Sequence, residues 1–180
     1  MQALTEFIDA TLNLAEYGLL SSKFYADWRS PSELHQESDL TYWKPIRQAA
    51  PVSFEGLSNA LELEIHPDIK AYYASYWSGT LEADSSEGRV SLIQLWNVED
   101  FDRLIANLIG HAMVKQKSRQ GFTVFIANTD PDTEIFLSID NTSGAILLEE
   151  PGKPPLRQVE TDIVTFLRRL KPKIRSAGIY

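Results

Sequence analysis

The sequence predicts an α+β fold, a single domain in which a mainly antiparallel sheet packs against several helices. The chain has 180 residues, which is near the usual size of one domain. Apolar residues recur at helical spacing in several separated segments, and short strand-like runs are joined by loops too short for a crossover helix. We expect one domain over residues 1–180, with a less regular N-terminal helix and loops in 1–65 and the sheet and helices in 66–172.

The N-terminal third carries the weaker patterns. Apolar spacing predicts an amphipathic helix over residues 4–19. Residues 29–57 contain three prolines and are interpreted as a long irregular connection, which its aromatic side chains pack down. Glu62 and Glu64 alternate with apolar residues, as on the solvent side of a short strand.

The middle of the chain has clearer signals. A second helix is predicted from Pro67 to Gly79, with aromatic residues along one face. Strands are expected over residues 80–83 and 89–96. Asn97 is the predicted N-cap of a long third helix, which Gly121 ends.

Three more strands are predicted over residues 122–127, 134–140 and 145–149, and their short turns favour an antiparallel meander. Residues 151–155 are expected to form a loop. A last helix is predicted over 161–170 and ends before Pro172. The basic residues of 168–175 suit the C-terminal end of that helix, with contact to anionic lipid as the alternative.

The charge distribution points to a basic partner. The net charge is −8, and residues 1–110 hold 17 acidic and seven basic side chains. An acidic body repels nucleic-acid phosphates and attracts basic proteins, although acidity can also serve solubility alone. The absence of cysteine excludes disulfides, thiolate metal sites and cysteine catalysis.

No catalytic motif is present. The sequence has no glycine-rich nucleotide loop, no H-E-x-x-H and no G-x-S-x-G. His35, His66 and His111 are not spaced as ligands on one helical turn. We therefore predict a non-catalytic protein without metal, cofactor or small-molecule substrate. The N-terminus lacks the features of a signal peptide and no apolar run is long enough to span a membrane, so a cytoplasmic location is expected.

Several motifs, in this order and spacing, resemble the Syd family of SecY-interacting proteins. They are IHPDIK (65–70), SLIQLW (91–96), EDF (99–101), NLIGH (107–111), TVFIA (123–127), DNTSG (140–144) and FLRRLKP (166–172). The resemblance covers most of the chain. Two positions depart from the family pattern, because Thr80 and Ala106 stand where acidic residues are usual.

The resemblance implies a SUKH-like fold and a peripheral protein on the cytoplasmic side of the inner membrane. Syd proteins bind SecY, the protein-translocation channel, and are thought to monitor its assembly. The resemblance also implies an acidic concave surface that receives the basic cytoplasmic loops of SecY. The alternative is a SUKH-type immunity protein that neutralises a basic toxin.

The candidate partner-binding residues combine that implication with their positions at strand ends, turns and a helix start. The acidic candidates are Glu82, Asp84, Glu99, Asp100, Asp132 and Glu134, and the candidate apolar anchors are Tyr76 and Trp77.

Overall fold

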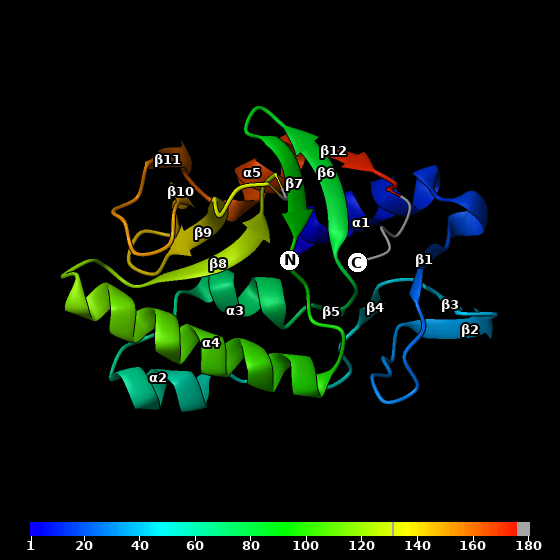
Figure 1. Cartoon of the computed structure of the whole chain (residues 1–180), viewed down its shortest axis with the longest axis horizontal. Helices are drawn as coiled ribbons and strands as arrows, with labels where there is room; N and C mark the ends of the chain where they lie inside the picture. Colours follow the sequence, from blue (N-terminus) through cyan, green and yellow to red (C-terminus); the bar gives the residue numbers. More distant parts are fainter. Residues whose placement is uncertain (131, 176–180) are drawn as a thin grey trace.

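An antiparallel sheet of seven strands forms the centre of the computed structural model, which describes residues 1–130 and 132–175 (Figure 1). The strand order is β11-β10-β9-β8-β7-β6-β12. The strands are β6 (Leu81–Ser85), β7 (Gly88–Leu92), β8 (Thr123–Asn128), β9 (Phe136–Asp140), β10 (Ile146–Glu149), β11 (Arg157–Glu160) and β12 (Lys171–Lys173). The predicted α+β class with a mainly antiparallel sheet is confirmed, as is the meander of β8, β9 and β10.

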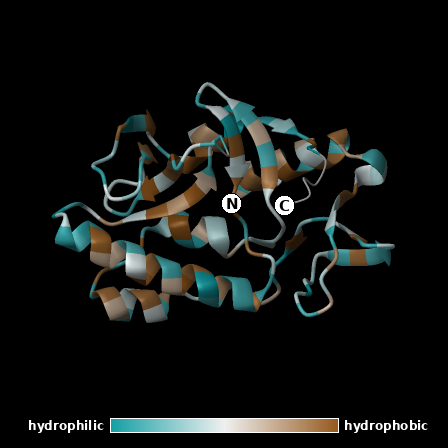
Figure 2. Ribbon diagram, viewed as in Figure 1, coloured by the Kyte–Doolittle hydropathy of each residue, from teal (hydrophilic) through white to brown (hydrophobic). Residues whose placement is uncertain are grey.

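Helices cover both sides of this sheet. Helices α1 (Gln2–Leu14) and α5 (Ile163–Arg169) pack together behind it, while α3 (Pro67–Tyr73) and the long α4 (Val98–Lys117) lie along β8 (Figure 1). Helix α2 (Glu55–Leu61) lies outside α4. Figure 2 shows hydrophobic bands along β8 and β9, where the sheet meets the helices.

The long helix begins where the sequence predicts. The Asn97 side chain accepts a hydrogen bond from the Asp100 amide at 2.8 Å, which satisfies one of the free N–H groups of the first turn. Glu99 and Asp100 lie in that turn, where negative charge complements the helix dipole. Asp162 caps α5 in the same way by accepting from the Thr165 amide at 2.8 Å.

The N-terminal region contains more regular secondary structure than predicted. Helix α1 ends at Leu14, and a short 3₁₀ turn with left-handed backbone at Tyr17 and Gly18 follows it. Residues 29–57, predicted to be irregular, contain β2 (Glu33–Glu37) and β3 (Leu40–Trp43). With β1 (Leu20–Lys23) these strands form a small sheet of order β1-β3-β2. β2 is almost wholly exposed, so it lacks the alternating apolar pattern by which a strand is recognised.

Two other predictions in this half of the chain are wrong. The predicted helix 67–79 stops at Tyr73, and β5 (Tyr76–Trp77) pairs instead with β4 (Ile46–Arg47). The alternation around Glu62 marks no strand, because Glu62 is the left-handed C-cap of α2. In the sheet, β7 ends at Leu92 rather than at residue 96, and β11 and β12 were not predicted.

Specific hydrogen bonds hold the N-terminal segment against the connection between β7 and α4. Ser30 Oγ donates to the Trp96 carbonyl at 2.5 Å, and Trp96 Nε1 donates to the Trp28 carbonyl at 2.9 Å. Asn97 Nδ2 donates to the Arg29 carbonyl at 2.8 Å. Trp43 is buried nearby, as predicted for the aromatic residues of this segment. These contacts place the tryptophans of the N-terminal segment beside the central sheet.

Candidate functional site

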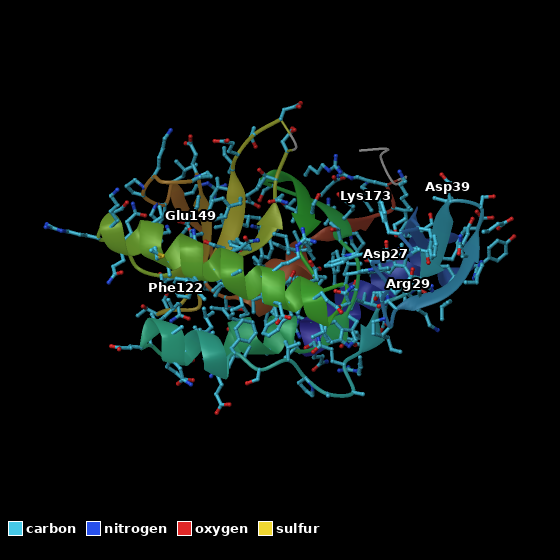
Figure 3. All side chains as sticks on the ribbon, turned by 60° about the horizontal axis from the view of Figure 1, so that its bottom comes forward. Asp27, Arg29, Asp39, Phe122, Glu149 and Lys173 are labelled. Carbon is cyan, nitrogen blue, oxygen red and sulfur yellow. The ribbon has the colours of Figure 1, made fainter. Side chains whose placement is uncertain are left out.

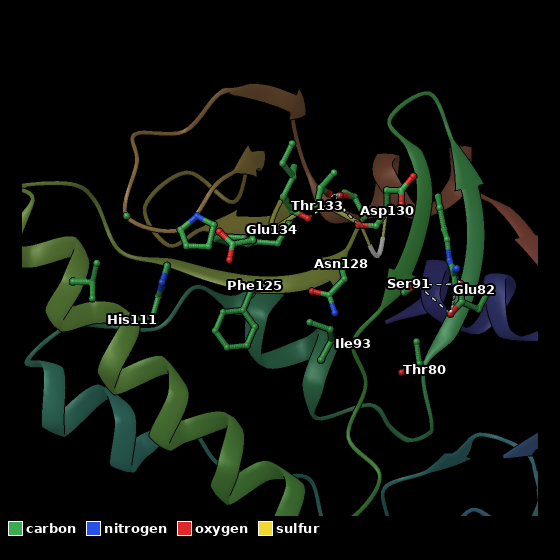
Figure 4. Close-up of a pocket in the computed structure, with 17 residues that line it drawn as sticks. Thr80, Glu82, Ser91, Ile93, His111, Phe125, Asn128, Asp130, Thr133 and Glu134 are labelled. Atoms are coloured by element: carbon green, nitrogen blue, oxygen red, sulfur yellow. Dashed lines mark hydrogen bonds and ion pairs between the residues drawn. The ribbon is translucent and has the colours of Figure 1, made fainter. Parts of the chain in front are cut away.

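A hollow of about 960 Å³ lies between α4 and strands β6 to β9 and is here called the main hollow (Figure 4). Its floor is apolar and includes Ile93, Phe125 and Phe136. Asp130 and Glu134, from the connection between β8 and β9, stand at its rim, and both are exposed. An apolar floor under a carboxylate rim suits a side chain with an apolar stem and a cationic end.

A second hollow of about 370 Å³, here called the side hollow, continues from the first. The two share Thr80, Glu82 and Arg89 in their walls. The opposite wall of the side hollow comes from the N-terminal region and includes Trp28 and Trp43. Together the main and side hollows form one groove across the sheet.

Glu82 forms the wall between the two hollows. It lies on β6 with the opposite orientation to buried Leu81 and Ala83, as alternation along a strand requires. Its carboxylate accepts hydrogen bonds from Ser91 Oγ at 2.9 Å and Arg89 Nε at 3.2 Å (Figure 4). Arg175 Nε lies 3.6 Å from the same carboxylate. This acid is therefore already engaged by cations of the chain itself.

The uncompensated acidity lies in the main hollow. Its charged lining consists of Glu82, Asp130 and Glu134 against the single guanidinium of Arg89. The lining of the side hollow is balanced. It holds Glu33, Glu82 and Asp100 together with Lys23, Arg89 and Arg175. A cationic ligand is thus favoured most strongly at the rim formed by Asp130 and Glu134.

Two titratable groups in the groove have shifted pKa values. Burial by itself would raise the pKa of Glu33, but hydrogen bonds from Arg29 and the Ser30 amide outweigh it and lower that pKa. Burial lowers the pKa of His111, because the charged imidazolium loses hydration there. His111 is therefore neutral at pH 7 and does not offset the acidic rim.

The structure brings some of the predicted acids together and separates others. Glu82, Asp100 and Glu134 line the groove, and Asp84 lies beside Glu82 on the same strand. Glu99 and Asp132 are exposed but line neither hollow. Asp100 also accepts the Trp96 amide at 3.0 Å, so it helps to fix the start of α4.

Two groove acids were missed by sequence reasoning. Asp130 lies two residues before Asp132, and Glu33 falls in the segment predicted to be irregular. The short turn predicted between residues 127 and 134 includes residue 131, which lies outside the described residues. Thr80, one of the departures from the family pattern, lines both hollows.

Tyr76 and Trp77 lie in the core rather than at the surface. Their exposed fractions are 6% and 8%. The Tyr76 hydroxyl bonds Thr5 Oγ1 at 2.9 Å, and the two residues form β5 against β4. Both rings therefore pack in the core, and Phe125 and Ile93 are among the apolar groups that line the groove.

The three histidines have separate partners. His35 stacks on Tyr42, His66 Nδ1 accepts the Asp68 amide at 3.2 Å, and His111 Nε2 bonds Thr123 Oγ1 at 2.9 Å. Across residues 1–130 and 132–175, no three histidine or carboxylate side chains gather closely enough to hold a metal ion. No helix in this described part of the chain has the length and apolar character needed to cross a bilayer.

A buried ion pair lies near the far end of the main hollow. Lys115 Nζ contacts the Glu149 carboxylate, which also accepts a hydrogen bond from Ser138 Oγ. In Figure 3, Glu149 lies on the other side of the molecule from Lys173 and Arg29. This pair connects α4 to β10 and thereby fixes one side of the hollow.

Comparisons with known proteins agree on one family. The family described as Syd protein (SUKH-2) matches residues 1–172. A Protein Syd from Pseudoalteromonas atlantica is 40% identical over 162 residues, covering 88% of this chain and 86% of the relative. A second from Hahella chejuensis is 40% identical over 153 residues, covering 85% and 79%. A third from Alteromonas mediterranea is 34% identical over 171 residues, covering 94% of each chain. This chain matches the family over nearly its whole length, and it therefore belongs to the Syd family.

Proposed function

We propose that this protein binds the basic cytoplasmic loops of the SecY translocation channel through its groove, and that it does so without catalysis. The observation that carries the proposal is the uncompensated rim of Asp130 and Glu134 above an apolar floor. Family membership supports SecY as the partner, since the Syd resemblance implies it. In this role the protein is peripheral on the cytoplasmic side of the inner membrane and monitors assembly of the translocon.

The physical fit rests on charge. Cytoplasmic loops of membrane proteins are rich in lysine and arginine. Carboxylates gathered in a concave surface attract such loops over distance and set their orientation. Once a loop is docked, the aliphatic part of a lysine or arginine can lie on Phe125 while its cation reaches Glu134.

The predicted acids take different parts in this proposal. Glu134 and Asp130 contact the loop at the main hollow, and Glu82 does so at the junction of the two hollows, with Asp84 two residues away on the same strand. Asp100 supports the start of α4 and adds charge to the side hollow. Glu99 and Asp132 contribute to the approach of the loop from outside the groove.

A pull-down of SecY from detergent-solubilised inner membranes tests the proposal. Glu134→Lys is the informative variant, because Glu134 is exposed, lines the main hollow and makes no hydrogen bond or ion pair among the described residues. The reversed charge should repel the basic loop, and SecY retention should fall several-fold.

The control is Asp9→Lys, which makes the same change of charge at an exposed position on α1 that lines neither hollow. It should retain SecY as the unchanged protein does. Equal retention by all three proteins would remove the main hollow from the binding site.

The SUKH-type immunity alternative uses the same groove for a basic toxin. Three observations together would favour the immunity function over SecY binding. They are a toxin gene beside the coding sequence, protection of cells that express that toxin, and no retention of SecY.

A further inference from the structure

The chain's own C-terminal strand places two cations on the acids at the groove junction. β12 pairs antiparallel with β6, with Lys173 opposite Glu82 and Lys171 opposite Asp84. This register puts Lys171 and Lys173 on the face that carries Asp84 and Glu82, and Arg175, two residues beyond β12, contacts both acids. The segment 171–175 is here called the basic strap.

The contacts are those a bound basic peptide would make. Arg175 Nη2 lies 2.5 Å from Asp84 Oδ1 and donates to the Ala83 carbonyl at 3.3 Å. Arg175 Nε lies 3.6 Å from Glu82 Oε2, and Lys173 Nζ lies 3.4 Å from Asp84 Oδ2. Arg175 also lines the side hollow. The strap therefore joins backbone pairing with β6 to charge pairing at the groove.

We propose that Glu82, Asp84 and the edge of β6 form a docking site for an extended basic segment of the partner, with basic side chains two residues apart, and that the basic strap occupies this site in the unbound protein. The proposal rests on the proposed function, because it describes how a basic loop could reach Glu82 and Asp84, which are already paired with cations of the chain itself. Binding then requires exchange, in which the partner's cations replace Lys173 and Arg175.

The strap is built to be exchanged. β12 has only three residues and lies at the edge of the sheet, where β6 is the one strand that pairs with it and α1 packs against it. Pro172, at its centre, has no N–H to donate. The Lys173–Asp84 pair is about half exposed, and exposed ion pairs contribute little net stability.

The partner's segment should have the same chemistry as the basic strap that it replaces. An extended peptide can add to a free sheet edge through its backbone, while alternate side chains supply selectivity. At this edge the side chains of β6 opposite Lys171 and Lys173 are both carboxylates, those of Asp84 and Glu82. A segment with lysine or arginine at positions i and i+2 therefore matches the site in spacing and in charge.

Fluorescence anisotropy with a synthetic fluorescein-labelled decapeptide, carrying lysine and arginine two residues apart among serines, tests the exchange. The variant Lys173→Gln/Arg175→Gln removes the internal cations but keeps the strand. It should bind the peptide about three- to thirtyfold more tightly, as expected for release of the partly exposed ion pairs that these two cations make with Glu82 and Asp84.

The matched control is Lys117→Gln/Arg119→Gln, at the end of α4. It removes two charges with the same spacing, and neither side chain makes an ion pair among the described residues. The control should change the dissociation constant less than twofold. If both double variants bind the peptide more tightly by the same factor, the change in net charge explains the effect and the proposed exchange is wrong. The same conclusion follows if the strap variant binds no more tightly than the unchanged protein.

Folding and the proposed function are tested separately. Thermal unfolding checks the strap variant, and Lys173→Gln alone, at a half-exposed position, replaces it if the double variant is unfolded. If Glu134→Lys leaves peptide binding unchanged, the groove is not the binding site and the proposed function fails. If Glu134→Lys weakens binding but the strap variants do not tighten it, the proposed function stands and the exchange fails.

Discussion

Glu87, in the turn between β6 and β7, is an acidic residue whose side chain is paired within the fold. Its carboxylate lies 2.8 Å from Arg169 Nη2 on α5 and 3.1 Å from Arg157 Nη2 on β11. Only 4% of the side chain is exposed. Burial would raise its pKa, but the hydrogen bonds from Arg169 and Arg157 outweigh burial and lower it to about 2.

This shift predicts a pH-dependent loss of stability in Glu87→Gln. A carboxyl group with a pKa of about 2 when folded and 4.5 when unfolded contributes on the order of 3 kcal/mol at pH 7. The contribution is complete above the unfolded pKa and disappears as the pH falls towards the folded pKa. Urea unfolding should show a variant less stable by about 3 kcal/mol at pH 7 and by about 1 kcal/mol at pH 3. A difference that is the same at both pH values would contradict this role.

The buried pair of Lys115 and Glu149 makes a second prediction. Lys115→Met leaves a fully buried carboxylate without its cation, and the free energy of unfolding should fall by about 3–5 kcal/mol. The double variant Lys115→Met/Glu149→Leu removes both charges and should recover most of that loss. Chemical unfolding of the two variants checks this, and equal destabilisation by both would mean that packing, not charge, sets the cost.

At the scale of elements, Asn97 joins two parts of the fold. Its Oδ1 caps α4, and its Nδ2 holds the Arg29 carbonyl of the N-terminal segment. Asn97→Asp keeps the cap but loses the donor, whereas Asn97→Ala loses both. We expect destabilisation by about 1 kcal/mol or less for aspartate and by about 2 kcal/mol for alanine. Thermal unfolding measures both. An aspartate variant as stable as the unchanged protein would show that the bond to Arg29 contributes nothing, and equal losses in the two variants would show that the cap contributes nothing.

Elements with a strong local signal were predicted, and those set by distant contacts were not. Helix α4 has a cap, a long apolar stripe and basic residues in its last turn, so its position follows from local chemistry. β12 is three residues long, and β2 is nearly all exposed. Each exists because a neighbouring strand pairs with it, which one sequence cannot show. Tyr76 and Trp77 continue the helical spacing of α3, yet pairing with β4 overrides it.

At the scale of the whole molecule, net charge indicates an excess of acidic side chains but not where the unpaired ones gather. The excess of acids lies before residue 111, yet several of these acids form internal pairs, as Glu6 does with Arg168. The acidic rim of the main hollow is formed by Asp130 and Glu134, from the nearly neutral remainder of the chain. Which acids stay unpaired depends on tertiary contacts, so only part of the site could be predicted.

Binding through this rim should depend on salt. Attraction between exposed charges is screened over about 10 Å at 0.1 M salt and about 3 Å at 1 M. The affinity for a basic SecY loop peptide should therefore fall more than tenfold between about 0.05 and 0.5 M salt, and Glu134→Lys should reduce this dependence. Anisotropy titrations across that range measure it. A constant affinity would point to apolar contacts instead.

The most direct test of the proposed function is site-specific photocross-linking to SecY in native membranes. A photoreactive residue at Thr133, in the main hollow, is compared with one at Asp9 on α1, and the adducts are mapped by mass spectrometry. We predict SecY adducts from Thr133 that map to lysine- and arginine-rich cytoplasmic loops, and none from Asp9. SecY adducts from Asp9 alone, or no SecY adduct from Thr133, would contradict binding through the acidic groove.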